Sequence, residues 1–258
     1  VNDRFFSTPV TLHNGLYYER ENSYLYDKDG SEIGRLALDR VKGQFSVGVH
    51  LFRKLLLMAG ISGERLWLEK NPQFGLSANT VEQWTGFAQV AFDNTDDHHF
   101  PTKGVRLLLK GESVADINFS ALSFTKFQSE FACHFPLRKG QTINALLFAG
   151  ISINGLPIYE KFRAGGPDNL QGIHRNELWG DFSLLTRLTY QIKLFKRWYF
   201  QTNLSMGNVN NSHLSFDNSI KGISTGVVAD APFGPVSILY GQSENGRSQL
   251  NLSLGYDF

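Results

Sequence analysis

The sequence predicts an all-β fold, an antiparallel transmembrane β-barrel of a bacterial outer membrane, formed as a single domain over residues 1–258. Three observations predict it. Apolar and polar residues alternate with a period of two, the alternating segments are about ten residues long, and short connections alternate with long ones. The hydrophobic content of 41% is ordinary, so the prediction depends on how these residues are arranged.

The clearest alternation lies at the C-terminal end of the chain. In segment 249–258 every second residue is apolar and the intervening ones are polar or small: Leu250, Leu252, Leu254, Tyr256 and Phe258 alternate with Asn251, Ser253, Gly255 and Asp257. Segments 184–194 and 198–206 repeat the pattern. A strand with one apolar and one polar face gives this period. A soluble ligand-binding barrel would leave the apolar stripe in water, so we expect lipid on that side.

The same pattern predicts further strands towards the N-terminus. They cover residues 236–241, 222–230, 142–153, 122–135, 105–113, 84–93, 55–69, 44–52 and 32–40. Asn14-Gly15 is a two-residue hairpin signal and predicts that 5–13 pairs with 16–26. The sum is about fourteen strands, with twelve or sixteen as alternatives, and an even number is expected of a single-chain outer-membrane barrel.

The predicted connections fall into two classes. The short ones are 53–54, 137–140, 195–197 and 231–235, and the long ones are 70–81, 154–179 and 208–219. Counting strands back from the C-terminus places all the short ones at one end of the barrel, as expected for periplasmic turns opposite extracellular loops. Aromatic residues near the strand ends suit girdles at the two membrane boundaries.

Composition excludes several classes of protein. The longest uncharged apolar run, 55–62, is far shorter than the roughly 18–20 residues of a membrane-spanning helix. The net charge of +1, without a basic run, argues against nucleic-acid binding. Cys133 is the only cysteine, so neither an internal disulfide nor a thiolate zinc cluster is expected. The chain starts at Val1 without a signal sequence, and we expect a mature or excised fragment.

Three motifs are weak candidates for chemistry. Residues 222–226 match the Gly-x-Ser-x-Gly pattern around Ser224, but strand residues rather than a helix follow, so we predict no enzyme activity. Asp96, Asp97, His98 and His99 contain potential metal ligands, yet a solvated turn is the simpler interpretation, and we predict neither metal nor cofactor. Gly165-Gly166 lacks the helix and the Lys-Ser/Thr of a phosphate loop and suits a tight loop tip.

Three segments, in this order, resemble the BamA-type superfamily of outer-membrane assembly and secretion barrels, the bacterial surface antigen family. Residues 100–104 (Phe-Pro-Thr-Lys-Gly) look like the turn before a middle strand, and residues 163–173 look like the tip of the long sixth extracellular loop. Residues 231–235 followed by 251–258 look like the last hairpin with its terminal aromatic residue. The resemblance covers roughly residues 87–258, and the remainder more loosely.

The resemblance implies two functional segments. The sixth loop of the family folds into the lumen, where the arginine of an Arg-Gly-Phe/Tyr motif contacts the inner wall; here Gln171 stands at the arginine position and Ile173 at the aromatic one. The expected loop motif consists of Arg163, Gly165, Gly166, Leu170, Gln171, Gly172, Ile173 and Arg175. The C-terminal signal for membrane insertion would be Leu254, Tyr256 and Phe258.

Because Gln171 carries no charge, we expect Arg163 or Arg175 to make the main contact of this loop, with lumen-facing Glu130 or Asp181. The resemblance implies a role in inserting, translocating or secreting proteins at the outer membrane, in part at the seam between the first strand and 249–258. The alternative is a passive anchor or pore for an N-terminal domain such as a patatin-like phospholipase. The expected partners are membrane lipids and a protein substrate or passenger, and both monomer and homodimer remain open.

Overall fold

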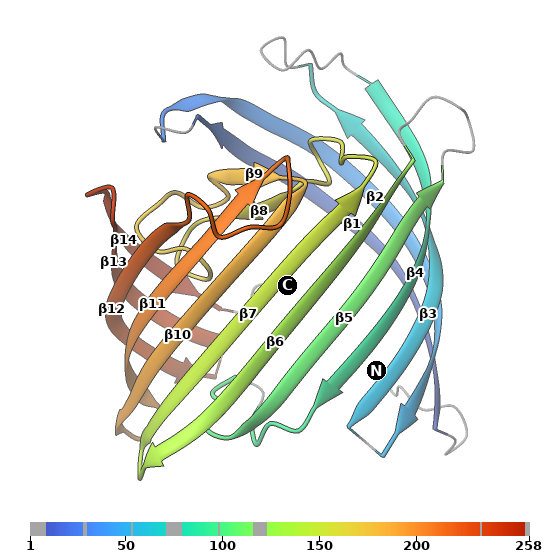
Figure 1. The fold of residues 1–258 in the computed structure, drawn as a ribbon. Coiled ribbons are helices and arrows are strands. Elements are labelled where there is room, and N and C mark those ends of the chain that lie inside the picture. Colours follow the sequence, from blue (N-terminus) through green and yellow to red (C-terminus); the bar gives the residue numbers. More distant parts are fainter. Residues whose placement is uncertain are drawn as a thin grey trace. The chain divides into compact units, whose positions relative to one another are not determined.

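The computed structural model describes residues 9–27, 30–52, 54–70, 79–97, 99–115, 123–232 and 234–255. Within these ranges all regular secondary structure is antiparallel β-strand (Figure 1). No helix that is long and apolar enough to cross a membrane occurs in these residues. The predicted all-β class is therefore confirmed.

Fourteen strands form in the described residues. They are β1 (Val10–Tyr26), β2 (Glu32–Leu51), β3 (Leu55–Leu68), β4 (Asn79–Asp93), β5 (Gly104–Ala115), β6 (Phe124–Arg138), β7 (Gln141–Ile153), β8 (Phe162–Ala164), β9 (Leu178–Gly180), β10 (Phe182–Phe195), β11 (Trp198–Asn210), β12 (Ile220–Ala231), β13 (Gly234–Ser243) and β14 (Ser248–Leu254). Twelve of them follow one another in a single sheet, whereas β8 and β9 pair separately. The predicted total of fourteen is thus reached with two short strands inside the long loop.

The predicted hairpin at Asn14-Gly15 is wrong. These two residues continue β1, where they pair with Phe45 and Gln44 of β2. The predicted strands 32–40 and 44–52 also merge, into β2. The local turn signal of an Asn-Gly pair is outweighed because a turn there would break an uninterrupted ladder between β1 and β2.

The chain divides into two compact units. One consists of Val1–Phe92, Leu107–Ser129 and Gly150–Lys161. The other consists of Asp93–Arg106, Glu130–Ala149 and Phe162–Phe258. The expectation of a single domain over residues 1–258 stays a prediction.

In the middle of β2 and β3, in the first unit, apolar side chains are exposed and their polar neighbours along the strand are buried. Phe45 of β2 and Ile61 of β3 are paired neighbours, and 51% and 56% of their surfaces are exposed. The next residues along each strand, Ser46 and Ser62, are fully buried. This distribution is the reverse of that in a soluble protein, where serine lies outside and isoleucine inside.

The second unit repeats this inversion on β11 and β12. Leu204 and Ile223 pair and are half exposed, whereas the adjacent pair Asn203 and Ser224 is buried. Polar side chains on the buried face bond along one row: the Thr189 hydroxyl donates to Asn203 Oδ1 (2.6 Å), and Asn203 Nδ2 donates to Ser224 Oγ (3.0 Å). An apolar face towards lipid and a hydrogen-bonded polar face away from it are what a membrane barrel requires.

Candidate functional site

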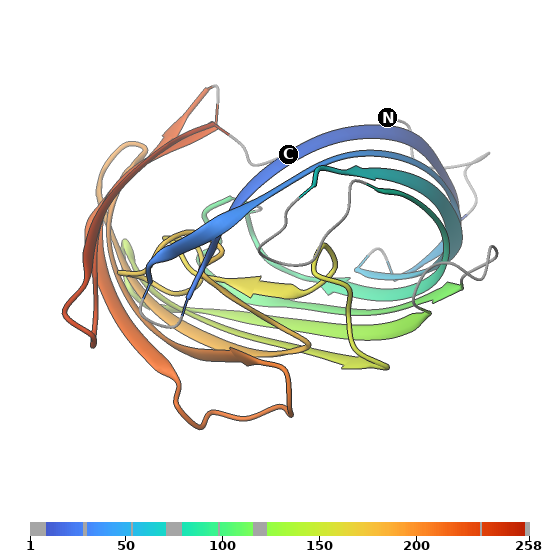
Figure 2. The same cartoon turned by 90° about the horizontal axis from the view of Figure 1, so that it is seen from above.

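The long connection between β7 and β10 contains its own small hairpin. Strands β8 and β9 pair antiparallel, with Arg163 opposite Trp179. The residues between them form the loop tip, in which Gly165, Gly166 and Gly172 all adopt positive φ angles. Figure 2 shows this loop in gold on the concave side of the orange and red strands β11 to β14. The sequence indicated the glycines, but strands of three residues are too short to show a period.

The loop tip packs backbone to backbone against the polar face of β12 and β13. A side chain on Gly172 would collide with the backbone of Ser243 and Gln242, and one on Gly222 would collide with the carbonyl of Gln171. The Gln171 amide also donates to Ser205 Oγ (3.4 Å). We call the receiving surface, Ser205, Gly222, Gly241 and Ser243, the loop seat. Glycines on both partners permit an approach that side chains would prevent.

Residues at the centre of the tip are completely buried. Leu170, Gln171 and Ile173 expose none of their surface. The Gln171 side chain donates to the carbonyl of Pro167 within the loop (3.1 Å), so the amide stabilises the turn itself. Asn169 Oδ1 accepts from the amides of Gly165 (3.0 Å) and Leu170 (3.1 Å). The tip is therefore an ordered element lying against the wall.

An ion pair anchors the C-terminal side of the tip. Arg247, in the turn between β13 and β14, lies 2.7 Å from Glu177 Oε1, and the Glu177 side chain is only 1% exposed. The second carboxylate oxygen accepts from the backbone amide of His174 (2.8 Å). The side chain of Gln249 in β14 lies 2.7 Å from His174 Nδ1. No sequence pattern predicted the Glu177–Arg247 pair, because partners far apart in the chain leave no local pattern.

A second cation of the wall reaches the loop. Arg187 of β10 donates from Nη1 to the backbone carbonyl of Asp168. Glu130, one expected partner of the loop, instead pairs with Arg106 at 2.8 Å. Arg163 and Arg175 lie on either side of the tip, and their expected contact with Glu130 or Asp181 stays a prediction.

The first part of the loop belongs to the other unit, where Glu160 joins a buried charge network. Its carboxylate lies 3.2 Å from Arg40 Nη2 and 2.6 Å from Lys126 Nζ. Arg40 also contacts Glu64 (3.6 Å), and Lys126 contacts Glu112 (3.6 Å). The charges alternate along the network, so each buried ion has an opposite neighbour. Desolvation and the nearby Glu160 carboxylate raise the pKa of the Tyr159 phenol to about 12.

The turn between β4 and β5 is built by carboxylates. Asp96 accepts from the Thr102 amide (2.8 Å) and hydroxyl (2.5 Å) and from the Lys103 amide (3.1 Å). Desolvation alone would raise the pKa of Asp96, but these hydrogen bonds outweigh it and lower the pKa to about 2. Hydrogen bonds from the amides of Phe100 and His99 likewise lower the pKa of Asp97.

These contacts give both aspartates a structural role in the turn. His98 lies outside the described residues, and within those residues no group of three or more potential metal ligands occurs. Phe100, at the end of the turn, is buried against Val228 and Leu239 and stacks on Tyr199 with ring centres 4.7 Å apart. The turn therefore packs on the same wall as the loop.

Ser224 lies in the middle of β12 and is 2% exposed. Its hydroxyl accepts the hydrogen bond from Asn203. The glycines of this Gly-x-Ser-x-Gly segment serve close packing, Gly222 under the loop and Gly226 against the backbone of Ile238. Of the expected insertion signal, Leu254 is exposed on the apolar face of β14, and Tyr256 and Phe258 lie outside the described residues.

The sequence matches the family model of the Omp85 superfamily domain over residues 1–258. The chain belongs to the Omp85 superfamily. This is the BamA-like β-barrel family with roles in outer-membrane protein assembly and secretion, so the resemblance seen in the sequence is confirmed.

Solved Omp85 structures share the fold. BamA from Haemophilus ducreyi lacking POTRA domains 1-3 superposes with a TM-score of 0.78 at 13% identity, over 97% of this chain and 59% of that one. CdiB from Escherichia coli gives a TM-score of 0.62 at 13% identity, over 95% of this chain and 48% of that one. The Omp85 chain thus spans about half to three fifths of these two proteins. No protein with a curated description matches it in sequence.

Proposed function

We propose that the chain is an integral outer-membrane barrel that helps to insert, translocate or secrete proteins, and that it is not itself an enzyme. The observation that supports this most directly is the loop tip seated on the polar face of the wall, with Gly172 against Ser243 and the Glu177–Arg247 pair beside it. In a barrel this face is the lumen, and a loop packed there obstructs passive diffusion. An obstructed barrel suits a gated or assembly role better than a permanently open pore.

The exposed apolar face supports the membrane part of the proposal. Leu250, Leu252 and Leu254 of β14 are each about two thirds exposed or more, next to half-exposed Ile238 and Tyr240 on β13. Side chains of this kind form the lipid-facing band of a barrel. The partners we propose are outer-membrane lipids on this face and an unfolded outer-membrane protein or a secreted passenger as the substrate.

The test is to reconstitute the chain in lipid vesicles and to measure how fast an unfolded outer-membrane protein folds into them. We expect folding several-fold faster than into empty vesicles of the same lipid. As a matched control, Ser212→Ala changes an exposed loop residue and should retain the acceleration. A rate equal to that of empty vesicles would contradict the proposal and favour the alternative, a passive anchor for another domain.

A further inference from the structure

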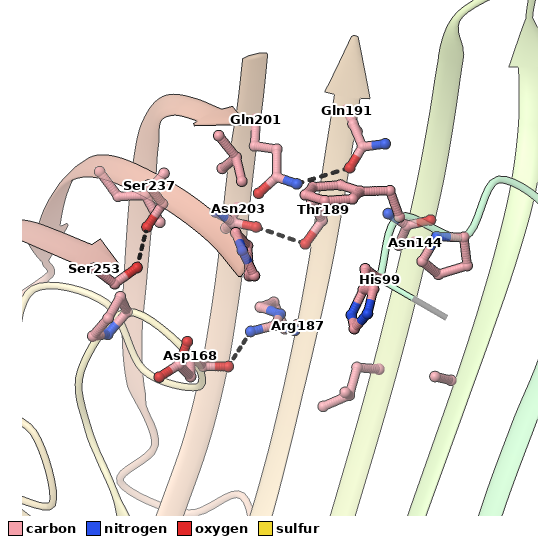
Figure 3. A pocket seen from close by; sticks show the side chains of 18 of the residues that line it. His99, Asn144, Asp168, Arg187, Thr189, Gln191, Gln201, Asn203, Ser237 and Ser253 are labelled. Carbon is pink, nitrogen blue, oxygen red and sulfur yellow. Dashed lines mark hydrogen bonds between the residues drawn. The ribbon is translucent and has the colours of Figure 1, made fainter. Parts of the chain in front are cut away.

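A polar chamber lies within the second unit, between the seated loop and the wall. Its volume is about 510 Å³, and it is lined by residues of the β4–β5 turn, of strands β5 to β7 and β10 to β14, and of the loop tip. Figure 3 shows Arg187, Thr189 and Gln191 along β10 facing Gln201 and Asn203 on β11. A chamber of this size holds a small organic ion.

Among the described lining residues, guanidinium groups outnumber carboxylates. Three guanidinium groups, of Arg106, Arg175 and Arg187, border the chamber, against the single carboxylate of Asp168 among the described lining residues. The Arg106 charge is offset by Glu130 at 2.8 Å. Guanidinium groups that border a confined polar space attract anions and raise their local concentration.

Arg187 of β10 is the cation of the lining that lies on the wall beside the loop tip. Among the described residues its one hydrogen-bond acceptor is the backbone carbonyl of Asp168, and no carboxylate lies within ion-pair distance. A guanidinium carries five N–H donors in a planar fork that matches a carboxylate or phosphate. Most of these donors are therefore available to a group inside the chamber.

The neighbouring side chains would orient the neutral part of such a ligand. Gln201 Nε2 donates to Gln191 Oε1 (2.7 Å). The Gln191 amide group uses its oxygen in this bond, so its N–H groups can donate to a ligand. Thr189 and Asn203 are fixed by their own hydrogen bond. A wall of ordered amides and hydroxyls beside a guanidinium that forms no ion pair within the described residues is the composition of a site for a polar oxyanion.

We propose that this chamber binds a small oxyanion, a carboxylate or phosphate group, with Arg187 as its principal ligand. The group belongs either to a free ion or to an acidic polypeptide, and the chemistry at Arg187 is the same in both. The proposal does not depend on the assembly or secretion role, because it rests on the chamber alone.

The test is titration calorimetry of the full chain in detergent at low ionic strength, with inorganic phosphate in one arm and an acidic hexapeptide in the other. We expect saturable binding in at least one arm. Phosphate binding alone identifies a free ion, and tighter binding of the peptide identifies a polypeptide. Absence of saturable binding in both arms would overturn the proposal.

Two substitutions with opposite expected effects make the test specific. Arg187→Gln should weaken binding at least tenfold, whereas Asp168→Asn should tighten it several-fold, because it removes the opposing carboxylate and keeps the backbone carbonyl that Arg187 contacts. Arg65→Gln, which alters an exposed pair on the first unit, is the control and should bind as the wild type does. Should Arg187→Gln fail to fold, Asp168→Asn decides alone: unchanged or weaker binding would refute the assignment.

Discussion

Replacing Arg247 by methionine should release the loop tip from its seat. The change removes the charge and keeps most of the length of the side chain, so the Glu177 carboxylate, 1% exposed, is left without its counter-ion. Breaking a buried ion pair by removing one partner costs about 3–5 kcal/mol. Because a quarter of the Arg247 side chain is exposed, solvent screens part of the interaction between the two charges. We therefore expect the substitution to cost about 2–4 kcal/mol. The equilibrium constant for opening should then rise about 30- to 700-fold.

Hydrogen–deuterium exchange measures this opening directly, because the amides of residues 165–177 exchange when the tip leaves the wall. Arg247→Met should accelerate their exchange by the factor given above. Combining it with Glu177→Gln should restore much of the protection, since the double variant buries no unpaired charge. Arg65→Met breaks an exposed pair elsewhere and should leave these amides unaffected. Equal exchange in the single and double variants would refute the assignment of the ion pair as the anchor.

Three further substitutions test the apolar face of β14, the loop seat and the β4–β5 turn. Leu252→Arg places a charge on the apolar face and should cost about 2–4 kcal/mol in reversible unfolding from vesicles, whereas Ser253→Arg on the polar face should cost much less; equal costs would contradict the facing. Gly172→Val cannot fit against the Ser243 backbone and should raise single-channel conductance in planar bilayers, and an unchanged conductance would place the obstruction elsewhere. The pKa of Asp96 is lowered to about 2. The stability that its charged carboxylate contributes to the fold is therefore fully present above the ordinary pKa of 3.8 and is lost as the pH falls through 2. Asp96→Asn should therefore cost about 1 kcal/mol at pH 7, discounted for the exposed carboxylate, and almost nothing well below pH 2. A cost independent of pH would refute the mechanism.

The alternation of apolar and polar residues predicted the strands of the C-terminal part well. The five predicted strands after the long loop correspond to β10 through β14, because each has a lipid-type face of leucine, isoleucine or aromatic side chains opposite amides and hydroxyls. In β1 and β2 the same approach failed, since Asn14-Gly15 is a strong local turn signal in a strand whose conformation is fixed by its neighbour. Local sequence preference does not report such a ladder.

The site was predictable in outline only. The glycines of the loop tip and the expected loop residues 163–175 were visible as a motif. The receiving surface was not, because Gly222 belonged to a pattern that also fits a nucleophilic serine and only its contact with Gln171 reveals its purpose. The expected signal at Tyr256 and Phe258 lies outside the described residues.

The buried tip also explains how glutamine can stand at position 171. This side chain exposes none of its surface, and its Nε2 donates to the Pro167 carbonyl inside the loop. An arginine there would need a carboxylate partner that is itself buried. Glu177 of the same loop is already paired with Arg247. Two cations that contact the loop, Arg187 of β10 and Arg247 of the β13–β14 turn, come from the wall, and their acceptors come from the loop. A neutral residue at the centre of the tip is consistent with this arrangement. The charged contacts lie on either side of the centre, and the centre itself packs backbone to backbone on Gly222.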